Sequence, residues 1–190
     1  MTKLILVKHS QPRISLEICS RRWVLSEEGR RRCDWLADES RSHGVARLYA
    51  SLEPKALETA ALVAVRTGLV LEPRLNLHEN DRTEFRFQAA DELRRRFREY
   101  FAQPAQITMG RETANGAFQR FAKAIANILS RGAGQNSAIV THGTVLSVFV
   151  AHRNGIAAYD LWACLGLPSY VVLDAGSFSF DGEVHNYPGC

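Results

Sequence analysis

Cysteine is scarce in this sequence, and no C-x-x-C pair or histidine at metal-ligand spacing accompanies the four that are present, Cys19, Cys33, Cys164 and Cys190. This spacing predicts neither a disulfide framework nor a metal site, and it fits a reducing, cytoplasmic environment. Long apolar runs are also lacking: the N-terminal run is too short for a secretory signal and is interrupted by Lys8, and no other segment approaches the length of a membrane span. We expect a soluble cytoplasmic protein that does not contact a membrane.

Internal repeats, low-complexity tracts and linkers are likewise missing. A chain of 190 residues that is 46% hydrophobic and 23% charged can form one compact domain with a sizeable core. The formal net charge of +4 comes with arginine-rich runs at residues 30–32 and 94–98. Such runs are typical of solvated helix faces, and no aromatic–basic platform or recognised module indicates a nucleic-acid partner. We predict one domain over residues 1–190.

Three short apolar runs indicate the centre of a parallel sheet. The predicted strands are Leu4–Val7, Val45–Ala50 and Ala138–Thr141. Continuous apolar runs of this kind suit strands that are buried on both faces, and helical patterns between them give the β-α-β rhythm of a parallel sheet. The fold class is therefore α/β, a three-layer α/β/α structure with a mostly parallel central sheet.

Helix signals follow the first two strands. Ser26 is a good N-cap, with Glu27 in the first turn of the helix that it begins, and the next helix runs from after Ser51 to Gly68. Apolar residues at helical spacing predict two more helices within residues 78–132. We interpret the segment at about 78–132 as a helical lid or insertion over the carboxyl edge of the sheet.

The remaining strands are expected at the margins of the sheet. Leu69–Leu71 is a short edge strand, and Tyr170–Leu173 is a strand near the C-terminus. Alternating apolar residues predict two further strands, Ser177–Phe180 and Val184–Tyr187, joined by a hairpin turn at Asp181-Gly182.

Polar residues with reactive side chains follow each central strand. Lys8-His9-Ser10 comes after the first strand, Ser51 after the second, and His142 after the third. In open α/β sheets, ligands bind beyond the carboxyl ends of the strands. We therefore expect these residues to meet at one edge of the sheet, with the two imidazoles close enough to contact one phosphoryl group, and His9 is the candidate nucleophile.

Lys55 violates a local rule of helix stability. It is predicted in the first turn of its helix, where the helix dipole disfavours a cation, four residues after Ser51 and on the same face. Such a violation often marks a functional site. Two lysines, two imidazoles and helix N-termini together describe an anion pocket, most naturally one for a phosphoryl group. Arg13 and Arg82, in loops near these residues, are further candidates for substrate binding.

Four segments resemble, in order, the motifs of the histidine phosphatase superfamily, which includes the cofactor-dependent phosphoglycerate mutases. They are Lys8–Ser10, Ser51 with Lys55–Ala60, Leu77–Glu79 and Val140–Gly143, and the resemblance runs from Leu4 to about Leu173.

The resemblance implies a phosphoglycerate mutase-like fold in which His9 is the nucleophile, Glu79 the general acid and base, and His142 a pocket imidazole. Lys8, Ser10 and Lys55 then belong to the substrate-binding residues with Arg13 and Arg82. The family pattern has Arg-His-Gly at the first site and usually arginine at the position of Lys55. Lysine keeps the charge but lacks the bidentate fork that grips two phosphate oxygens.

These residues predict a metal-independent phosphatase that forms a phosphohistidine intermediate. Protein cations and His142 would stabilise charge on the phosphoryl oxygens, so no cofactor or metal is required. To act as an acid, Glu79 would need a raised pKa, which a low-dielectric pocket can provide. The expected partner is a small phosphorylated metabolite, phosphate or a phosphoprotein. A phosphoglycerate mutase-type transferase and a non-catalytic phosphate-binding regulator are the alternatives, and neither the substrate nor the oligomeric state follows from the sequence.

Overall fold

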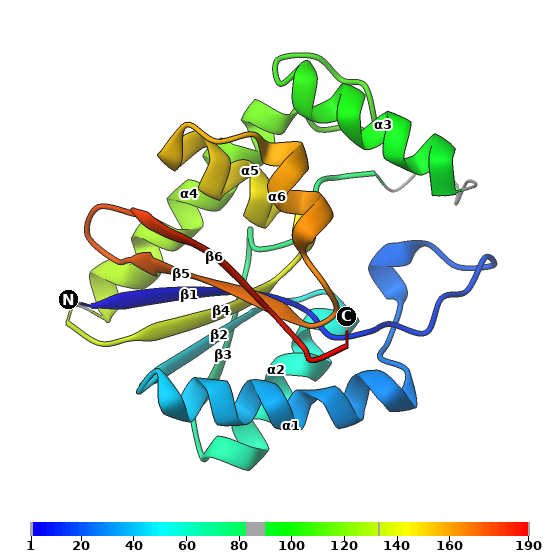
Figure 1. Cartoon of the computed structure of the whole chain (residues 1–190). Helices are drawn as coiled ribbons and strands as arrows, with labels where there is room; N and C mark the ends of the chain where they lie inside the picture. The colour runs from blue at the N-terminus through cyan, green and yellow to red at the C-terminus, as the bar shows by residue number, and fades with distance from the viewer. Residues whose placement is uncertain (1, 83–89, 133, 190) are drawn as a thin grey trace.

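The computed structural model describes residues 2–82, 90–132 and 134–189. Within them, six strands form one sheet in the order β3-β2-β4-β1-β5-β6, as Figure 1 shows. The first four strands of this order are parallel to one another, and β5 runs antiparallel to both of its neighbours, β1 and β6. The predicted mostly parallel sheet is therefore confirmed. In chain order the strands are β1 (Lys3–Lys8), β2 (Arg47–Ser51), β3 (Leu71–Arg74), β4 (Ser137–Thr141), β5 (Ser169–Asp174) and β6 (Phe180–Asn186).

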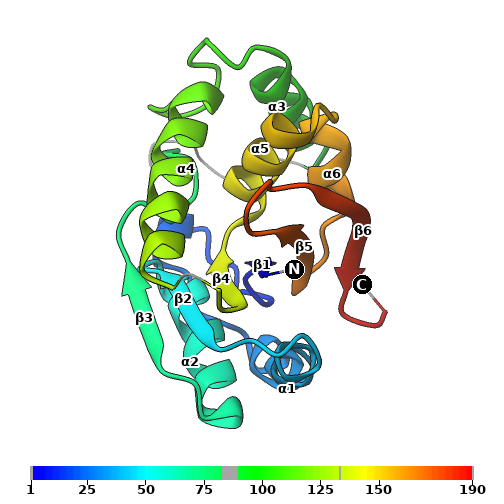
Figure 2. The same ribbon diagram turned by 90° about the vertical axis from the view of Figure 1, so that its left-hand side faces the viewer.

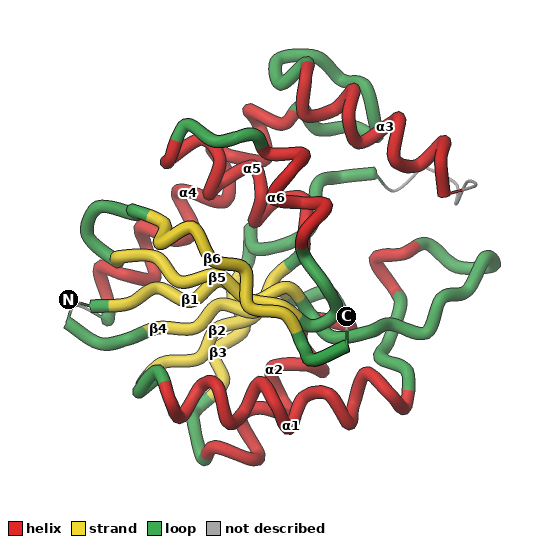
Figure 3. The backbone as a smooth tube through the Cα atoms, viewed as in Figure 1, coloured by secondary structure: helices red, strands yellow, loops and turns green. Residues whose placement is uncertain are grey.

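Helices cover both faces of this sheet and complete the predicted three layers. Helices α1 and α2 lie on one face, and α4, α5 and α6 lie on the other (Figures 2 and 3). One further helix, α3, packs against α6 outside this layer. None of the described helices is long and apolar enough to cross a membrane. The helices are α1 (Glu27–Ser42), α2 (Pro54–Thr67), α3 (Ala90–Ala102), α4 (Ala114–Arg131), α5 (Gly143–Asn154) and α6 (Ala158–Cys164), and a short 3-10 helix, η1, spans Ser20–Arg22.

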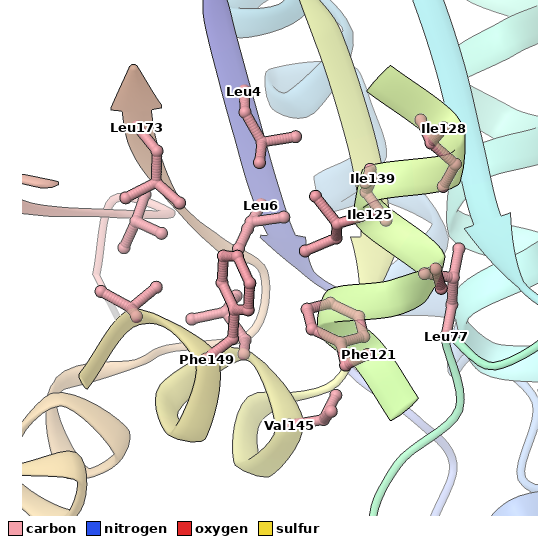
Figure 4. Packing of buried hydrophobic residues seen from close by; sticks show 14 of the residues in the cluster. Leu4, Leu6, Leu77, Phe121, Ile125, Ile128, Ile139, Val145, Phe149 and Leu173 are labelled. Atoms are coloured by element: carbon pink, nitrogen blue, oxygen red, sulfur yellow. The ribbon is translucent and has the colours of Figure 1, made fainter. Parts of the chain in front are cut away.

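The core is divided by β1, whose successive side chains point to opposite faces of the sheet. Leu4 and Leu6 pack toward α4 and α5, whereas Ile5 and Val7 pack toward α1 and α2. All four are at least 96% buried, so the apolar run that predicted this strand is explained by contact on both faces. Figure 4 shows the first cluster, in which the labelled residues include Phe121, Ile125, Ile128, Ile139 and Phe149.

The predicted helix boundaries near the site are confirmed by their caps. The Ser26 hydroxyl accepts a hydrogen bond from the backbone N–H of Gly29 at the start of α1. Gly68 ends α2 in the left-handed conformation, with φ of 76°, which costs glycine little. Ser51, however, belongs to β2, and the N-cap of α2 is Glu53.

The predicted hairpin turn at Asp181-Gly182 is wrong. Both residues lie inside β6. Between the pairs Val171–Val184 and Leu173–Phe180, β5 moves on by two residues and β6 by four, so β6 bulges at this point. The turn lies earlier, because the Asp174 carboxylate accepts hydrogen bonds from two backbone N–H groups and the hydroxyl that follow it. The side-chain hydrogen bonds of Asp174 stabilise the turn that follows it, whereas the Asp181-Gly182 pair is accommodated in the bulge of β6 and forms no hairpin turn.

Two other expectations need adjustment. The edge strand β3 starts at Leu71, where the predicted Leu69–Leu71 ended, and it includes Pro73. Among the residues that the structure describes, β3 pairs with β2 alone, and an edge strand tolerates a residue without a backbone N–H. The helix α6 was not predicted, because its seven residues are too few to show a helical period.

The segment predicted as a lid contains two helices with different surroundings. α4 contributes Ala117, Phe121 and Ile125 to the main core, so it belongs to the helical layer on the sheet. α3 packs against α6 through Phe97 and Trp162, whose rings stack with centroids 4.1 Å apart. Residues 83–89, which fall within the predicted lid at 78–132, lie outside the described residues.

Candidate active site

The carboxyl ends of β1 and β4 bring His9 and His142 together. Lys8 pairs with Thr141 in neighbouring parallel strands, so the two histidines follow at the same level. The backbone N–H of His9 donates to the carbonyl oxygen of Thr141 at 3.0 Å. The imidazole centroids are 5.2 Å apart, with the ring planes at 64°. The predicted convergence of the two histidines at one edge of the sheet is confirmed.

A single hydrogen bond determines which nitrogen of His9 carries its proton. His9 Nδ1 lies 2.8 Å from the carbonyl oxygen of Ser10. A carbonyl oxygen only accepts, so Nδ1 must donate, and in the neutral ring the lone pair is then on Nε2. Burial, His142 and Lys55 hold the pKa of His9 well below its usual value, in that order of importance. The imidazole is therefore neutral near pH 7 and has an unprotonated nitrogen.

His142 is fully buried beside Ser51. Its Nε2 lies 2.9 Å from the Ser51 hydroxyl, and its Nδ1 has no hydrogen-bond partner among the described residues. Burial and then the positive charge of Lys55 keep the pKa of His142 well below its usual value. Both imidazoles are therefore neutral in the free protein, and the positive charge of the site comes from lysine and arginine.

Lys55 is held by a buried carboxylate that sequence reasoning missed. Its Nζ donates to Glu53 Oε2 at 2.5 Å and to the carbonyl oxygen of Ser20 at 2.9 Å. The other oxygen of Glu53, Oε1, accepts from the backbone N–H of Glu79 at 3.1 Å. Glu53 Oε2 also lies 3.8 Å from Nε2 of His142. Glu53, at the start of α2, therefore connects the Lys55 ammonium, the loop of Glu79 and the imidazole of His142.

Lys8 approaches the site from β1 along the start of α5. Its Nζ donates to the carbonyl oxygen of Leu165 at 2.8 Å. A Cβ atom at Gly143 would lie 3.2 Å from Lys8 Cε and 3.3 Å from Cδ. Glycine at the first position of α5 therefore provides the space along which the lysine side chain lies.

Glu79 occupies the N-terminus of α5. Its carboxylate accepts backbone hydrogen bonds from Asn80, Thr144 and Val145 at 3.0 to 3.2 Å, and Arg82 Nη2 lies 3.6 Å from Oε2. Burial raises the pKa of Glu79, but Arg82, the field of His142 and the N–H of Asn80 outweigh burial, so the pKa lies below its ordinary value. The expected rise in pKa is wrong for the free protein, because a low-dielectric pocket does not prevail over a cation and three N–H donors.

The structure separates the other predicted binding residues. Arg82 lines the cavity over His9, together with Lys8, Lys55 and Glu79. The Ser10 side chain is fully buried, and its hydroxyl donates to the carbonyl oxygen of Gly29 at 2.7 Å, toward α1. Arg13 is exposed and is not one of the described residues that line the cavity.

A cavity of about 910 Å³ opens over this group. Its inner end contains His9, both lysines and Glu79, and its outer walls come from the loop after β1, from α3 and from α6. Across residues 2–82, 90–132 and 134–189, no group of three or more His, Cys, Asp or Glu side chains is placed to hold a metal ion.

The model of the histidine phosphatase superfamily (branch 1) matches residues 4–183 of this chain. The chain belongs to this superfamily. Among solved structures, native mycobacterial glucosyl-3-phosphoglycerate phosphatase has a TM-score of 0.74 at 17% identity, over 95% of this chain and 97% of that one. Bacillus stearothermophilus YhfR has a TM-score of 0.74 at 24% identity, over 95% and 94%. A phosphoserine phosphatase mutant from Entamoeba histolytica, in complex with phosphoserine, has a TM-score of 0.76 at 14% identity, over 96% and 98%.

At identities below 25%, these likenesses establish a shared fold. No curated protein sequence matches this chain. The family and the three-layer fold are thus the predictions that the comparisons confirm, whereas the roles of individual residues stay predictions.

As a histidine phosphatase superfamily member, the chain compensates locally for its departures from the family pattern. Ser10 lies where the resemblance leads us to expect glycine, and its hydroxyl is satisfied by the carbonyl of Gly29. Lys55 lies where the resemblance leads us to expect arginine, and the carboxylate of Glu53, two residues earlier, fixes its ammonium. The nearness of Glu53 and Lys55 in the sequence was a usable signal, although only the fold shows that both are buried.

Proposed function

We propose that this protein is a metal-independent phosphomonoesterase that acts through a phosphohistidine at His9. The observation that carries the proposal is the hydrogen bond from His9 Nδ1 to the carbonyl of Ser10. It directs the lone pair to Nε2 of a neutral ring in a cavity that Lys8, Lys55 and Arg82 also line. A neutral nitrogen nucleophile beside three cations suits attack on a phosphoryl dianion.

In the first step, Nε2 of His9 forms a bond to phosphorus as the bond between phosphorus and the ester oxygen breaks. Lys8, Lys55 and Arg82 neutralise the phosphoryl oxygens. His142 is fully buried beside His9 and is not one of the described residues that line the cavity, so it acts from behind the His9 ring. The leaving oxygen takes a proton from Glu79. In the second step, Glu79 accepts a proton from water, the water oxygen bonds to phosphorus, and the electron pair of the N–P bond returns to His9.

The proton on Glu79 is supplied when substrate binds. Glu79 is ionised in the free protein, because its pKa is lowered. A phosphoryl dianion placed beside this carboxylate adds like-charge repulsion, which raises a carboxyl pKa. Binding of the substrate is then coupled to uptake of one proton, and the bound complex contains the acid that the leaving group requires.

The test is hydrolysis of a panel of phosphomonoesters with and without EDTA, by the wild-type protein and by His9→Ala. We expect turnover that survives the chelator and is lost in the variant. A base-stable, acid-labile phosphate should be trapped on the wild-type protein by rapid alkaline quenching. Turnover that requires added metal, or that persists undiminished in His9→Ala, contradicts the proposal.

The same panel separates the two alternatives. A mutase returns the phosphoryl group to the substrate carbon skeleton and releases little phosphate, and a regulator binds phosphate without turnover. The replacement of arginine by Lys55, and the pairing of Lys55 with Glu53, is the observation that favours a regulator. Phosphate release at a steady rate excludes both.

A further inference from the structure

We infer that the preferred substrate carries its phosphate on a bulky, uncharged apolar group, aliphatic or aromatic, and not on a small group with a carboxylate, such as glycerate or an amino acid. This inference rests on the proposed function and names the substrate class of the same site. The cavity over His9 is divided into a charged inner end and apolar outer walls, and the outer part has room for a group larger than glycerate within its volume of about 910 Å³.

One outer wall is the loop that follows β1. Ile14, Leu16 and Ile18 line the cavity from this loop, and their side chains are 56%, 76% and 46% exposed. Three large apolar side chains within five residues expose a patch that a soluble domain does not need for folding. Their exposure toward a cavity, next to the candidate nucleophile, indicates contact with an apolar ligand.

The other wall is aromatic and comes from α3 and α6, which Figure 1 shows at the same end of the sheet as η1. Phe97 and Trp162 line the cavity as a stacked pair, with ring centroids 4.1 Å apart. The Arg82 guanidinium lies 5.1 Å from the centroid of Phe97 and 3.6 Å from Glu79. Arg82 therefore marks the boundary between the phosphoryl end and the aromatic wall.

The charges of the lining residues distinguish between apolar and anionic leaving groups. The described cations that line the cavity are Lys8, Lys55 and Arg82, and all three lie at the phosphoryl end. Among the described residues of the outer walls, the charged side chain is Glu17. A carboxylate on the leaving group would meet this like charge, and no described cation of the outer walls would offset it.

The experiment compares n-butyl, n-hexyl and n-octyl phosphate with 3-phosphoglycerate and phosphoserine. The three alkyl alcohols have nearly equal leaving-group pKa values, so differences among them report contacts of the chain. A fully buried methylene changes an equilibrium about fourfold, and the cavity is open on one side. We therefore expect kcat/KM to rise about two- to fourfold per methylene, and to be lower for the two substrates that carry a carboxylate than for hexyl phosphate.

A matched pair of variants locates the contact. Leu16→Ser removes an apolar side chain from the cavity wall, whereas Leu75→Ser removes one of similar exposure, 73% against 76%, outside the lining residues. We expect Leu16→Ser to flatten the increase with chain length and Leu75→Ser to leave it unchanged. A flat series for the wild-type protein, a preference for 3-phosphoglycerate, or equal effects of the two variants overturns the inference.

The affinities of butyl- and octylphosphonate, measured by calorimetry, test the apolar subsite without requiring turnover. If no phosphomonoester is hydrolysed, the proposed function fails, but tighter binding of octylphosphonate still supports an apolar subsite. If alkyl phosphates are hydrolysed and the phosphonates bind with equal affinity, the proposed function stands and the apolar subsite fails.

Discussion

Glu53 Oε2 and Lys55 Nζ lie 2.5 Å apart, with side chains that are 5% and 7% exposed. Such a pair recovers the cost of removing both charges from water only through good geometry and additional hydrogen bonds. The carbonyl of Ser20 and the backbone N–H of Glu79 provide them. The cation that breaks the dipole rule at the start of α2 is therefore fixed by a carboxylate in the same turn.

The first prediction concerns the stability that this pair contributes. Glu53→Ala leaves the buried Lys55 ammonium without its carboxylate, and we expect it to lower the free energy of unfolding by about 3–5 kcal/mol, as for other broken buried pairs. Lys55→Ala should cost a similar amount. The double variant, measured by urea unfolding, should lose much less than the sum of the two. Additive losses would mean that the two side chains act independently.

The second prediction follows from the two neutral imidazoles. The folded-state pKa values of His9 and His142 lie well below 6.5, so below pH 6.5 the unfolded chain binds more protons than the folded one. Their contribution to stability is therefore fully present above pH 6.5 and is lost as the pH falls toward the folded-state values. Each histidine should contribute a slope of up to about 1.4 kcal/mol per pH unit in that window.

Urea unfolding of the wild-type protein and of His9→Gln between pH 8 and 5.5 checks this. Below pH 6.5, the free energy of unfolding should fall less steeply with decreasing pH in the variant than in the wild-type protein, because the variant lacks the contribution of His9. Above pH 6.5, the two slopes should agree. Glu79 titrates in a separate window, because its pKa lies below its ordinary 4.5, and the stability that it contributes is lost only as the pH falls below that value. Parallel curves throughout would show that His9 gains no pKa shift on folding.

The third prediction tests Glu79 as the acid. Glu79→Gln keeps an oxygen for the N–H groups of α5 but cannot protonate a leaving group, so alkyl phosphates should slow by roughly 10²–10⁴, while activated aryl phosphates are affected less. Asp81→Asn is the matched control, since Asp81 lies two residues away and its Oδ1 is 3.7 Å from Arg21. An equal loss on both substrate types, or a larger loss in Asp81→Asn, assigns the acid role elsewhere.

A fourth prediction uses the proton that Glu79 takes up. Calorimetric binding of an alkylphosphonate to His9→Ala, in buffers of different ionisation enthalpy near pH 6, gives the net uptake of protons by the complex. The uptake should be smaller in the double variant that also carries Glu79→Gln. No difference between the two proteins would indicate that Glu79 stays ionised beside the ligand.

The sequence predicted the site where polar residues follow apolar strands, because parallel strands must place their carboxyl ends together. His9 and His142 were found in this way, and so was Lys55, whose position opposes the helix dipole. Glu53 was missed because an acidic residue near a helix start is ordinary on a surface, and only the fold shows that it is buried. The cavity walls were missed for a related reason: the loop of Ile14 to Ile18 has no period, and only the fold shows that it lines one cavity together with α3 and α6.

The last prediction concerns the path of Lys8 along α5. Gly143→Ala should not weaken the helix itself, since alanine is the better helix former, but its Cβ would lie 3.2 Å from Lys8 Cε and should displace the ammonium. We expect weaker competitive inhibition by phosphate and a lower kcat/KM, with little change in the urea midpoint. In the Lys8→Ala background the same change should have no further effect, because the side chain that it displaces is gone. A loss of equal size with and without Lys8 would mean that Gly143 acts through the backbone of α5, and the assignment of Lys8 to phosphoryl binding would lose its support.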